Sequence, residues 1–207
     1  MNFTDITILL AYGTLVIELT VFPIPSEAST LSLLRHDHQE KPLTDALSKA
    51  RERSRSSKLL RFFLPTTIGI CLFAMPLLAT LWPQLRAAFF PIGLEEVTTL
   101  GLAFIIAGRL LTFSSVLQLR SAKRRKCIPN GLFIYSRNPG LVGMFIFYIG
   151  LCLTLGGPWL WLGLPLYFTN MHHRVLLEEA QLTATHGDSW REYLQRAARY
   201  LPIPGLK

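Results

Sequence analysis

The fold of this chain is decided by two apolar runs joined at a tight turn, GLVGMFIFYIGLCLTLGGPWLWLGLPLYFTNM, residues 140–171. Residues 140–155 and 159–171 contain no charged side chain, and only Gly156-Gly157-Pro158 separates them. A connection this short joins antiparallel neighbouring helices. The sequence therefore predicts a helical hairpin made of two short spans.

Three more apolar segments precede the hairpin, at residues 6–22, 60–82 and 97–119. Each is close to the roughly 20 helical residues that cross a bilayer, and Pro65 and Pro76 predict kinks in the second. Half of the 207 residues are hydrophobic and the mean hydropathy is +0.35, which excludes a disordered chain. The first segment lacks a basic n-region and a cleavage site, so we interpret it as a structural helix. We therefore expect an all-α membrane protein with about five transmembrane helices.

The basic residues orient these spans. The net charge is +8, and the basic side chains gather in the loops at residues 35–61 and 120–126, whereas the loop around Glu95 and Glu96 holds only Arg86. Because basic loops remain on the cytoplasmic side, the N-terminus is predicted outside and the C-terminus in the cytoplasm. Confinement of the charge to loops also favours a membrane over nucleic acid as the partner.

The chain is expected to have two regions. Residues 1–130 hold the first three spans and their basic loops, with a helix expected at residues 43–55 on anionic headgroups. Residues 131–207 hold the hairpin and a structured tail. The cysteines are scattered without ligand spacing, so neither a metal site nor a disulfide framework is expected: they are Cys71, Cys127 and Cys152.

The tail is predicted to form two helices. The first, at residues 172–185, leaves the membrane and ends at His186-Gly187, where glycine tolerates a left-handed conformation. Ser189-x-x-Glu192 has the spacing of a capping box, which predicts a second helix at residues 190–199. We expect this second helix to end before Pro202 and to pack back as a cytoplasmic lid, through an apolar face of Trp190, Tyr193 and Leu194.

Two charged motifs lie where the hairpin meets water. Arg137-Asn138-Pro139 opens the first span, with proline suited to the first helical turn and free amides that favour an anion. The alternative is a plain membrane-entry turn in which Arg137 meets lipid phosphate. After the second span, Arg174 and Glu178 stand four apart on one helix face, beside Glu179. They indicate either a ligand pocket at the membrane surface or a surface ion pair.

Arg109 is a third charged feature, because it lies well inside the span at residues 97–119. An arginine at that depth costs several kcal/mol on insertion scales, about 3 kcal/mol, unless it is paired or reaches the interface. Two interpretations stay open: a structural pair with Glu18 in the first span, or a polar wall of a substrate cavity.

The C-terminal motifs resemble a known family. The chain reads GLFIYSRNPGLVG at residues 131–143, RVLLEEAQL at residues 174–182 and HGDSWREY at residues 186–193, followed by Pro202. Over about the C-terminal third, this resembles the isoprenylcysteine carboxyl methyltransferase family and its phospholipid methyltransferase relatives. Asn138 replaces the family histidine, and Leu141 and His186 replace a tyrosine and a phenylalanine. Asn138 can still form hydrogen bonds but cannot carry a proton.

The resemblance implies S-adenosylmethionine bound at the cytoplasmic side and a lipophilic acceptor that enters from the bilayer. In-line methyl transfer from a sulfonium needs no metal. The cofactor would be lined by Tyr135, Arg137, Asn138, Pro139, Leu141 and Glu178. The catalytic residues would be Arg174, Glu178 and Glu179, with Arg174 near the acceptor. Arg109 and Trp190 are expected at the substrate cavity.

The predicted function is therefore an integral membrane methyltransferase with S-adenosylmethionine as cofactor and an isoprenylcysteine-like carboxylate as acceptor. Three alternatives stay open: a phospholipid amine N-methyltransferase with Glu178 or Glu179 as base, a sterol-reductase-like enzyme that uses NADPH, and a non-enzymatic membrane scaffold. The membrane would be a bacterial inner membrane or the endoplasmic reticulum, and the sequence leaves the oligomeric state open.

Overall fold

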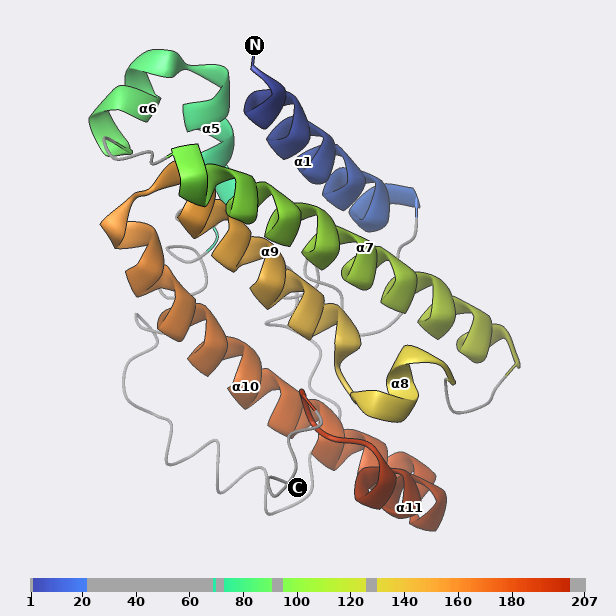
Figure 1. The fold of residues 1–207 in the computed structure, drawn as a ribbon. Coiled ribbons are helices and arrows are strands. Elements are labelled where there is room, and N and C mark those ends of the chain that lie inside the picture. The colour runs from blue at the N-terminus through green and yellow to red at the C-terminus, as the bar shows by residue number, and fades with distance from the viewer. Residues whose placement is uncertain (1, 22–68, 70–72, 91–94, 126–129, 202–207) are drawn as a thin grey trace.

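The structure is a computed structural model that describes residues 2–21, 69, 73–90, 95–125 and 130–201 (Figure 1). Within these ranges the regular elements are helices and no strand is present, which confirms the all-α class for this part of the chain. The elements are α1 (Phe3–Val21), α5 (Met75–Leu81), α6 (Pro83–Phe89), α7 (Glu95–Arg125), α8 (Leu132–Tyr135), α9 (Pro139–Leu155), α10 (Pro158–His186) and α11 (Asp188–Arg196).

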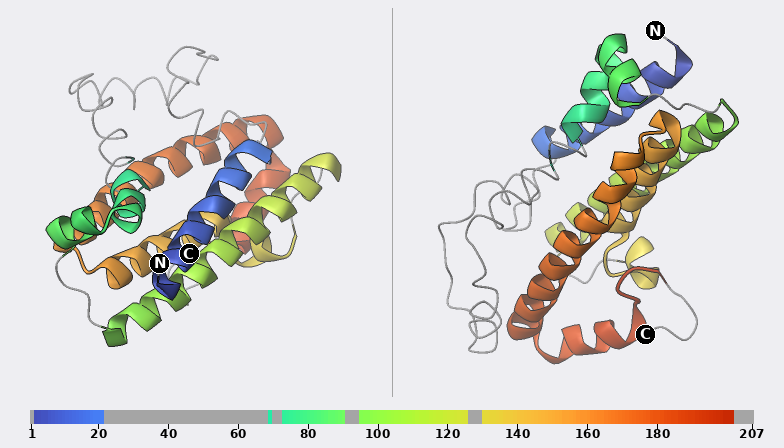
Figure 2. Two further views of the ribbon diagram at one scale, coloured as in Figure 1. Left: turned by 90° about the horizontal axis from the view of Figure 1, so that it is seen from above. Right: turned by 90° about the vertical axis from the view of Figure 1, so that its left-hand side faces the viewer.

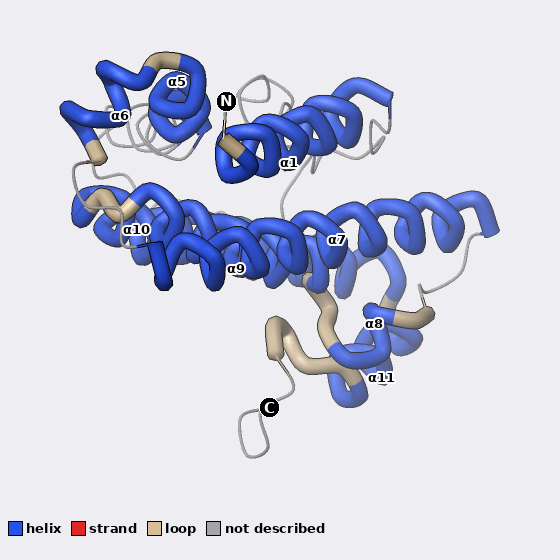
Figure 3. Tube along the Cα trace, turned by 45° about the horizontal axis from the view of Figure 1, so that its top comes forward, coloured by secondary structure: helices blue, strands red, loops and turns tan. Residues whose placement is uncertain are grey.

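The helices α1, α7, α9 and α10 lie side by side in that order (Figure 1). The short helices α5 and α6 lie beside the N-terminal end of α1, which the two further views also show (Figure 2). Helices α8 and α11 lie together at the end where α9 begins and α10 ends (Figure 3). The two charged motifs are therefore carried to one end of the helix group.

The predicted helical hairpin is confirmed. Helix α9 ends at Leu155 and α10 begins at Pro158, with Gly156 in the left-handed region at φ 70°. The Tyr148 hydroxyl donates to the carbonyl oxygen of Leu160 across the turn at 2.6 Å. Glycine suits Gly156 because a side chain at positive φ is strained. The hairpin therefore follows from local sequence.

Close contact between α7 and α9 depends on small residues. A Cβ atom added to Gly150 would lie 2.7 Å from the carbonyl oxygen of Gly101, and one added to Gly143 would lie 2.8 Å from that of Gly108. The two backbones therefore touch along two successive contacts. Membrane helices use this kind of interface because lipid supplies no hydrophobic force to bring them together.

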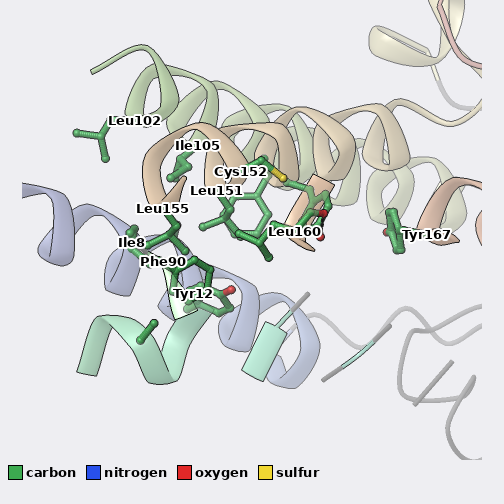
Figure 4. Packing of buried hydrophobic residues seen from close by; sticks show 14 residues of the cluster. Ile8, Tyr12, Phe90, Leu102, Ile105, Leu151, Cys152, Leu155, Leu160 and Tyr167 are labelled. Atoms are coloured by element: carbon green, nitrogen blue, oxygen red, sulfur yellow. Dashed lines mark hydrogen bonds between the residues drawn. The ribbon is translucent and has the colours of Figure 1, made fainter. Parts of the chain in front are cut away.

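A buried apolar cluster joins the helices α1, α5, α7, α9 and α10 (Figure 4). Ile8 of α1, Ile105 of α7, Leu151 of α9 and Leu160 of α10 are all fully buried. Tyr12 adds an edge-to-face contact with the ring of Phe147, with ring centroids 5.9 Å apart. Burial of such side chains contributes roughly 2 kcal/mol each in an aqueous reference, so this cluster fixes how α1 sits on the hairpin.

The predicted spans are described only in part. Within the described residues, one helical segment is long and apolar enough to cross a membrane, Val97–Ser121 of α7, and Pro139–Leu155 is a shorter apolar helix. Most of the predicted span at residues 60–82, including Pro65, lies outside the described residues, as do the predicted helix at residues 43–55 and the cysteines Cys71 and Cys127. Pro76 lies in the first turn of α5, after a π-helical turn at residues 73–74.

The predicted tail helix at residues 172–185 is confirmed as the last part of α10, and the second tail helix is wrong in two details. Helix α10 continues unbroken from Pro158 to His186, so the second span and the exit helix are one helix. Helix α11 begins at Asp188 after Gly187, so Ser189 lies within its first turn instead of capping it. The helix ends at Arg196 rather than at residue 199, because the backbone beyond it bonds to a distant turn: Arg137 N–H donates to the carbonyl oxygen of Ala198 at 2.7 Å.

Candidate functional site

The Arg137-Asn138-Pro139 turn is the entry to α9, as predicted. Pro139 occupies the first turn of the helix and Asn138 is its N-cap residue, without a side-chain capping bond. The buried Ser136 hydroxyl accepts from the Asn138 N–H at 3.1 Å. The side chain of Asn138 is therefore not used to cap the helix, and it bonds elsewhere.

Glu179 of α10 binds two arginines that come from different segments of the chain. Its Oε1 lies 2.7 Å from Nη1 of Arg137. Arg199 approaches in a forked geometry, with Nη2 2.9 Å from Oε2 and Nε 3.2 Å from both carboxylate oxygens. The side chains of Arg137 and Glu179 are only 11% and 12% exposed. We call these three residues the Glu179 cluster, and it brings the two predicted motifs into direct contact.

The Glu179 cluster carries more positive than negative charge. Two guanidinium groups share one carboxylate, and burial lowers the pKa of Arg137, with the charge of Arg199 acting in the same direction and Glu179 opposing it. The hydrogen bond to Glu179 instead raises the pKa of Arg199. Nε of Arg137 is buried and has no hydrogen-bond partner among the described residues. Such a donor costs about 1–3 kcal/mol unless an acceptor meets it, so the cluster favours an anionic or acceptor ligand.

Residues 197–200, which we call the C-terminal strap, tie the tail to the turn. Ser136 and Ala198 form an isolated parallel bridge. The Asn138 amide Nδ2 donates to the carbonyl oxygen of Arg199 at 3.0 Å. Asn138 therefore serves as a hydrogen-bond donor to the strap, a role that its amide fills without a titratable proton.

The strap is also fixed to α10. The Tyr200 hydroxyl lies 2.8 Å from Nδ1 of His172, and the His172 ring stacks on Phe168 with centroids 5.7 Å apart. One face of α10 carries four residues that are spaced four, three and four positions apart: Phe168, His172, Val175 and Glu179. This face meets both the turn and the strap.

Helix α11 is anchored in the same region. The Tyr193 hydroxyl donates to the carbonyl oxygen of Phe133 at 2.9 Å, and burial raises the pKa of Tyr193 to about 12. The rings of Trp190 and Tyr193 lie 5.0 Å apart, and Nε1 of Trp190 is buried without a hydrogen-bond partner among the described residues. Helix α11 thus packs back against α8, as predicted, while its role as a lid stays a prediction.

The other predicted site residues are more scattered. Glu178 is half-buried one position from Glu179, and Leu141 packs against the apolar cluster of the helix group. Tyr135 is 65% exposed on α8, outside the Glu179 cluster. Arg174 lies on α10 one turn before Glu178, but its side chain is outside the described residues. The roles proposed for these residues stay predictions.

Arg109 pairs with Glu18, which was one of its two interpretations. Nη2 of Arg109 lies 2.7 Å from Oε1 of Glu18, and both side chains are at most 7% exposed. Nε of Arg109 also donates to Oγ1 of Thr14 at 3.0 Å, and the guanidinium lies over the ring of Phe147. This pair connects α7 to α1, and a contribution of Arg109 to a substrate cavity stays a prediction.

Arg199 and Tyr200 were not singled out from the sequence. The adjacent carboxylates Glu178 and Glu179 signal a need for cations, but the tail holds several arginines and the sequence does not indicate which one binds. Because residues 190–199 were predicted to be helical, the non-helical strap was not expected. Only the long-range bonds between the strap and the turn reveal these two residues.

Comparison with known proteins finds relatives of the region that holds most of this site. Residues 97–189, from α7 to the start of α11, match the family model described as phospholipid methyltransferase. The chain is 29% identical over 117 residues to a protein-S-isoprenylcysteine O-methyltransferase of Schizosaccharomyces pombe, which covers 51% of this chain and 49% of that protein. It is 27% identical over 137 residues to one of Tribolium castaneum, which covers 58% and 47%. No solved structure matches the chain significantly.

The matches confirm the resemblance found in the motifs, to the phospholipid and isoprenylcysteine methyltransferases. The chain spans about half the length of the curated relatives that it matches. Arg199 and the C-terminal strap lie beyond the matched region at residues 97–189.

Proposed function

We propose that this chain is an integral membrane methyltransferase that uses S-adenosylmethionine and methylates a lipophilic acceptor with a carboxylate, such as a prenylated cysteine. The observation that carries the proposal is the buried Glu179 cluster, where Arg137 keeps a donor without a partner among the described residues. The names of the two curated relatives support the acceptor class.

The residues present suit the cofactor. S-adenosylmethionine carries a carboxylate, an ammonium group and ribose hydroxyls. Nε of Arg137, with the excess positive charge of the Glu179 cluster, suits the carboxylate. The half-buried carboxylate of Glu178 suits the ammonium or a hydroxyl, and Nε1 of Trp190 is a second buried donor. Asn138 holds the strap in place beside these groups.

The chemistry divides between cofactor and protein. When bound, the cofactor supplies a methyl group activated by a positively charged sulfur. Arg137 holds the anionic end, and Arg174 orients the acceptor carboxylate, which needs no general base. Catalysis then depends on alignment and on removal of water from the nucleophile, which together can supply several kcal/mol, about 7 kcal/mol in well-oriented systems. An amine acceptor would instead require a base, for which Glu178 is the candidate.

The membrane arrangement is part of the proposal. Large apolar side chains point outward on three helices: Leu10 of α1 is 66% exposed, Leu110 of α7 is 63% exposed and Leu162 of α10 is 69% exposed. The Arg109–Glu18 pair lies inward. Apolar side chains outside and charges inside suit a protein surrounded by lipid. We place the N-terminus outside and the C-terminus in the cytoplasm, in a bacterial inner membrane or the endoplasmic reticulum.

A phospholipid amine is the second acceptor class, which the name of the matching family model favours. Two measurements decide. The first is binding of S-adenosylmethionine, S-adenosylhomocysteine and NADPH to the purified protein in detergent. We expect the first two to bind, and absence of both would overturn the proposal, with NADPH binding alone pointing to a reductase.

The second measurement is methyl transfer to two acceptors. One is a farnesylated cysteine derivative with a free carboxylate, and the other is phosphatidylethanolamine in vesicles. We expect a base-labile methyl ester on the first. Transfer to the phosphatidylethanolamine amine alone would establish the phospholipid alternative and remove the carboxylate acceptor from the proposal.

A further inference from the structure

The contact between Arg199 and Glu179 determines which hydrogen bonds Arg137 can form with the same carboxylate. The forked contact of Arg199 occupies Oε2 of Glu179 and shares Oε1. Arg137 is left with a single bond, from Nη1 to Oε1 at 2.7 Å. An arginine and a carboxylate normally prefer two parallel bonds. Arg137 has therefore been restricted to half of the usual pairing.

The consequence is the buried Nε of Arg137, which has no hydrogen-bond partner among the described residues. We propose that Arg199 is a positioning residue: by occupying Glu179, it keeps the Arg137 Nε–H available to an acceptor atom of the bound cofactor. This inference rests on the proposed function, and it concerns a residue beyond the matched region at residues 97–189.

Removal of the Arg199 side chain reverses this arrangement. The Glu179 carboxylate can then rotate to accept from both Nε and Nη1 of Arg137, because its Oε2 no longer accepts from Arg199. The excess positive charge of the Glu179 cluster is lost in the same step. Both changes remove a charged donor from the ligand and leave the Arg137–Glu179 pair intact.

The strap allows this side chain to be tested separately from the backbone. Asn138 binds the carbonyl oxygen of Arg199, and Tyr200 is anchored on His172, so neither contact uses the Arg199 side chain. Arg196 supplies a matched control, because it lies three residues earlier and its side chain is 80% exposed. Among the ion pairs of the described residues, it meets only Glu192, at 3.6 Å.

The experiment measures the affinity of the full chain in detergent for S-adenosylhomocysteine, with KM for S-adenosylmethionine and kcat. In Arg199→Ala we expect affinity to fall about tenfold, as loss of one charged hydrogen bond predicts. KM should rise by a similar factor, with kcat changed less than about twofold because the acceptor contacts remain. Arg196→Ala should bind like the unaltered chain. Unchanged affinity in Arg199→Ala overturns the inference.

A double variant distinguishes positioning from a simple structural clamp. If Arg199 acts through Arg137, then Arg199→Ala has no further effect on affinity in an Arg137→Ala background. An equal loss in both backgrounds overturns the positioning role. If Arg199→Ala fails to fold, Arg199→Lys carries the same test, with about a threefold loss expected since lysine lacks the fork. Absence of binding to the unaltered chain overturns the proposed function instead, which keeps the two failures apart.

Discussion

Arg137 and Glu179 form a buried ion pair, with Nη1 and Oε1 2.7 Å apart, although 42 positions separate them in the chain. The pair joins the entry of α9 to the far half of α10. Since Arg199 completes the Glu179 cluster from the strap, three segments of the C-terminal region depend on one carboxylate.

Glu179→Gln should therefore destabilise the protein strongly. The change leaves Arg137 buried without a counter-charge, and breaking a buried pair by removing one partner typically costs about 3–5 kcal/mol. Thermal unfolding in detergent measures the effect. Glu192→Gln is the control, because Glu192 pairs with Arg196 at the surface, with side chains 71% and 80% exposed, and should leave the melting temperature unchanged. Similar melting temperatures for both variants would contradict this assignment.

The contact between α7 and α9 predicts a second loss of stability. A methyl group at Gly150 meets backbone atoms of Ile105 at 2.6 Å and Gly101 at 2.7 Å, so Gly150→Ala must push the helices apart. We expect destabilisation by about 1–3 kcal/mol, the usual cost of overpacking. Gly13→Ala is the control, since nothing lies within 4 Å of that Cβ position, and it should be neutral or stabilising. A harmless Gly150→Ala would mean that the helices are not in direct contact.

The Arg109–Glu18 pair predicts a non-additive result. Arg109→Met leaves the buried Glu18 carboxylate without its charged partner. Glu18→Met leaves the buried Arg109 guanidinium without its charged partner. Each single change should destabilise by about 3–5 kcal/mol, whereas the double change should recover much of the loss because no charge remains unpaired. A double-variant cycle of melting temperatures measures the coupling. Additive losses would show that the pair is not the main partner of either side chain.

The predictions from sequence succeeded where the signal was local. Gly156-Gly157-Pro158 sets the hairpin and Pro139 sets the start of α9, because each acts through its own backbone angles. The strap could not be predicted, because the residues after Arg196 leave the helix to bond with a turn about 60 positions earlier. Helical propensity favours continuation there, and only the folded chain supplies the competing bonds.

The residues of the candidate site were likewise predicted only where the signal was local. Spacing brought Arg137 and the Glu178–Glu179 pair to attention, and the structure joins Arg137 to Glu179. Tyr135 fitted the motif equally well yet is exposed, since spacing along a short helix does not determine which side faces the neighbours. Arg199 could be identified only from the contacts of the strap in the folded protein.

Arg174→Lys tests the proposed role of Arg174 at the acceptor. Lysine keeps the charge but cannot form two parallel bonds to a carboxylate. We expect binding of S-adenosylhomocysteine to be retained and kcat to fall by a factor of about 100, as for loss of one oriented charged contact. Arg191→Lys, at an exposed arginine of α11 that pairs with Asp188, should leave both unchanged. Unaltered turnover in Arg174→Lys would remove that residue from the mechanism.

Tyr193 predicts how stability changes at high pH. Burial raises its pKa to about 12 in the folded protein, compared with about 10 for a free tyrosine. Folding therefore favours the protonated hydroxyl, which donates to the carbonyl oxygen of Phe133 at 2.9 Å.

The contribution of this hydroxyl to the free energy of unfolding is complete below about pH 10 and is lost as pH rises toward about 12. The difference in melting temperature between the unaltered chain and Tyr193→Phe should thus shrink between about pH 10 and about pH 12, from the pKa of the unfolded tyrosine to that of the folded one. Tyr135→Phe, which removes an exposed hydroxyl, is the matched control variant. A difference for Tyr193→Phe that is independent of pH would mean that the hydroxyl is not held protonated against α8, and that α11 is anchored by its apolar side chains alone.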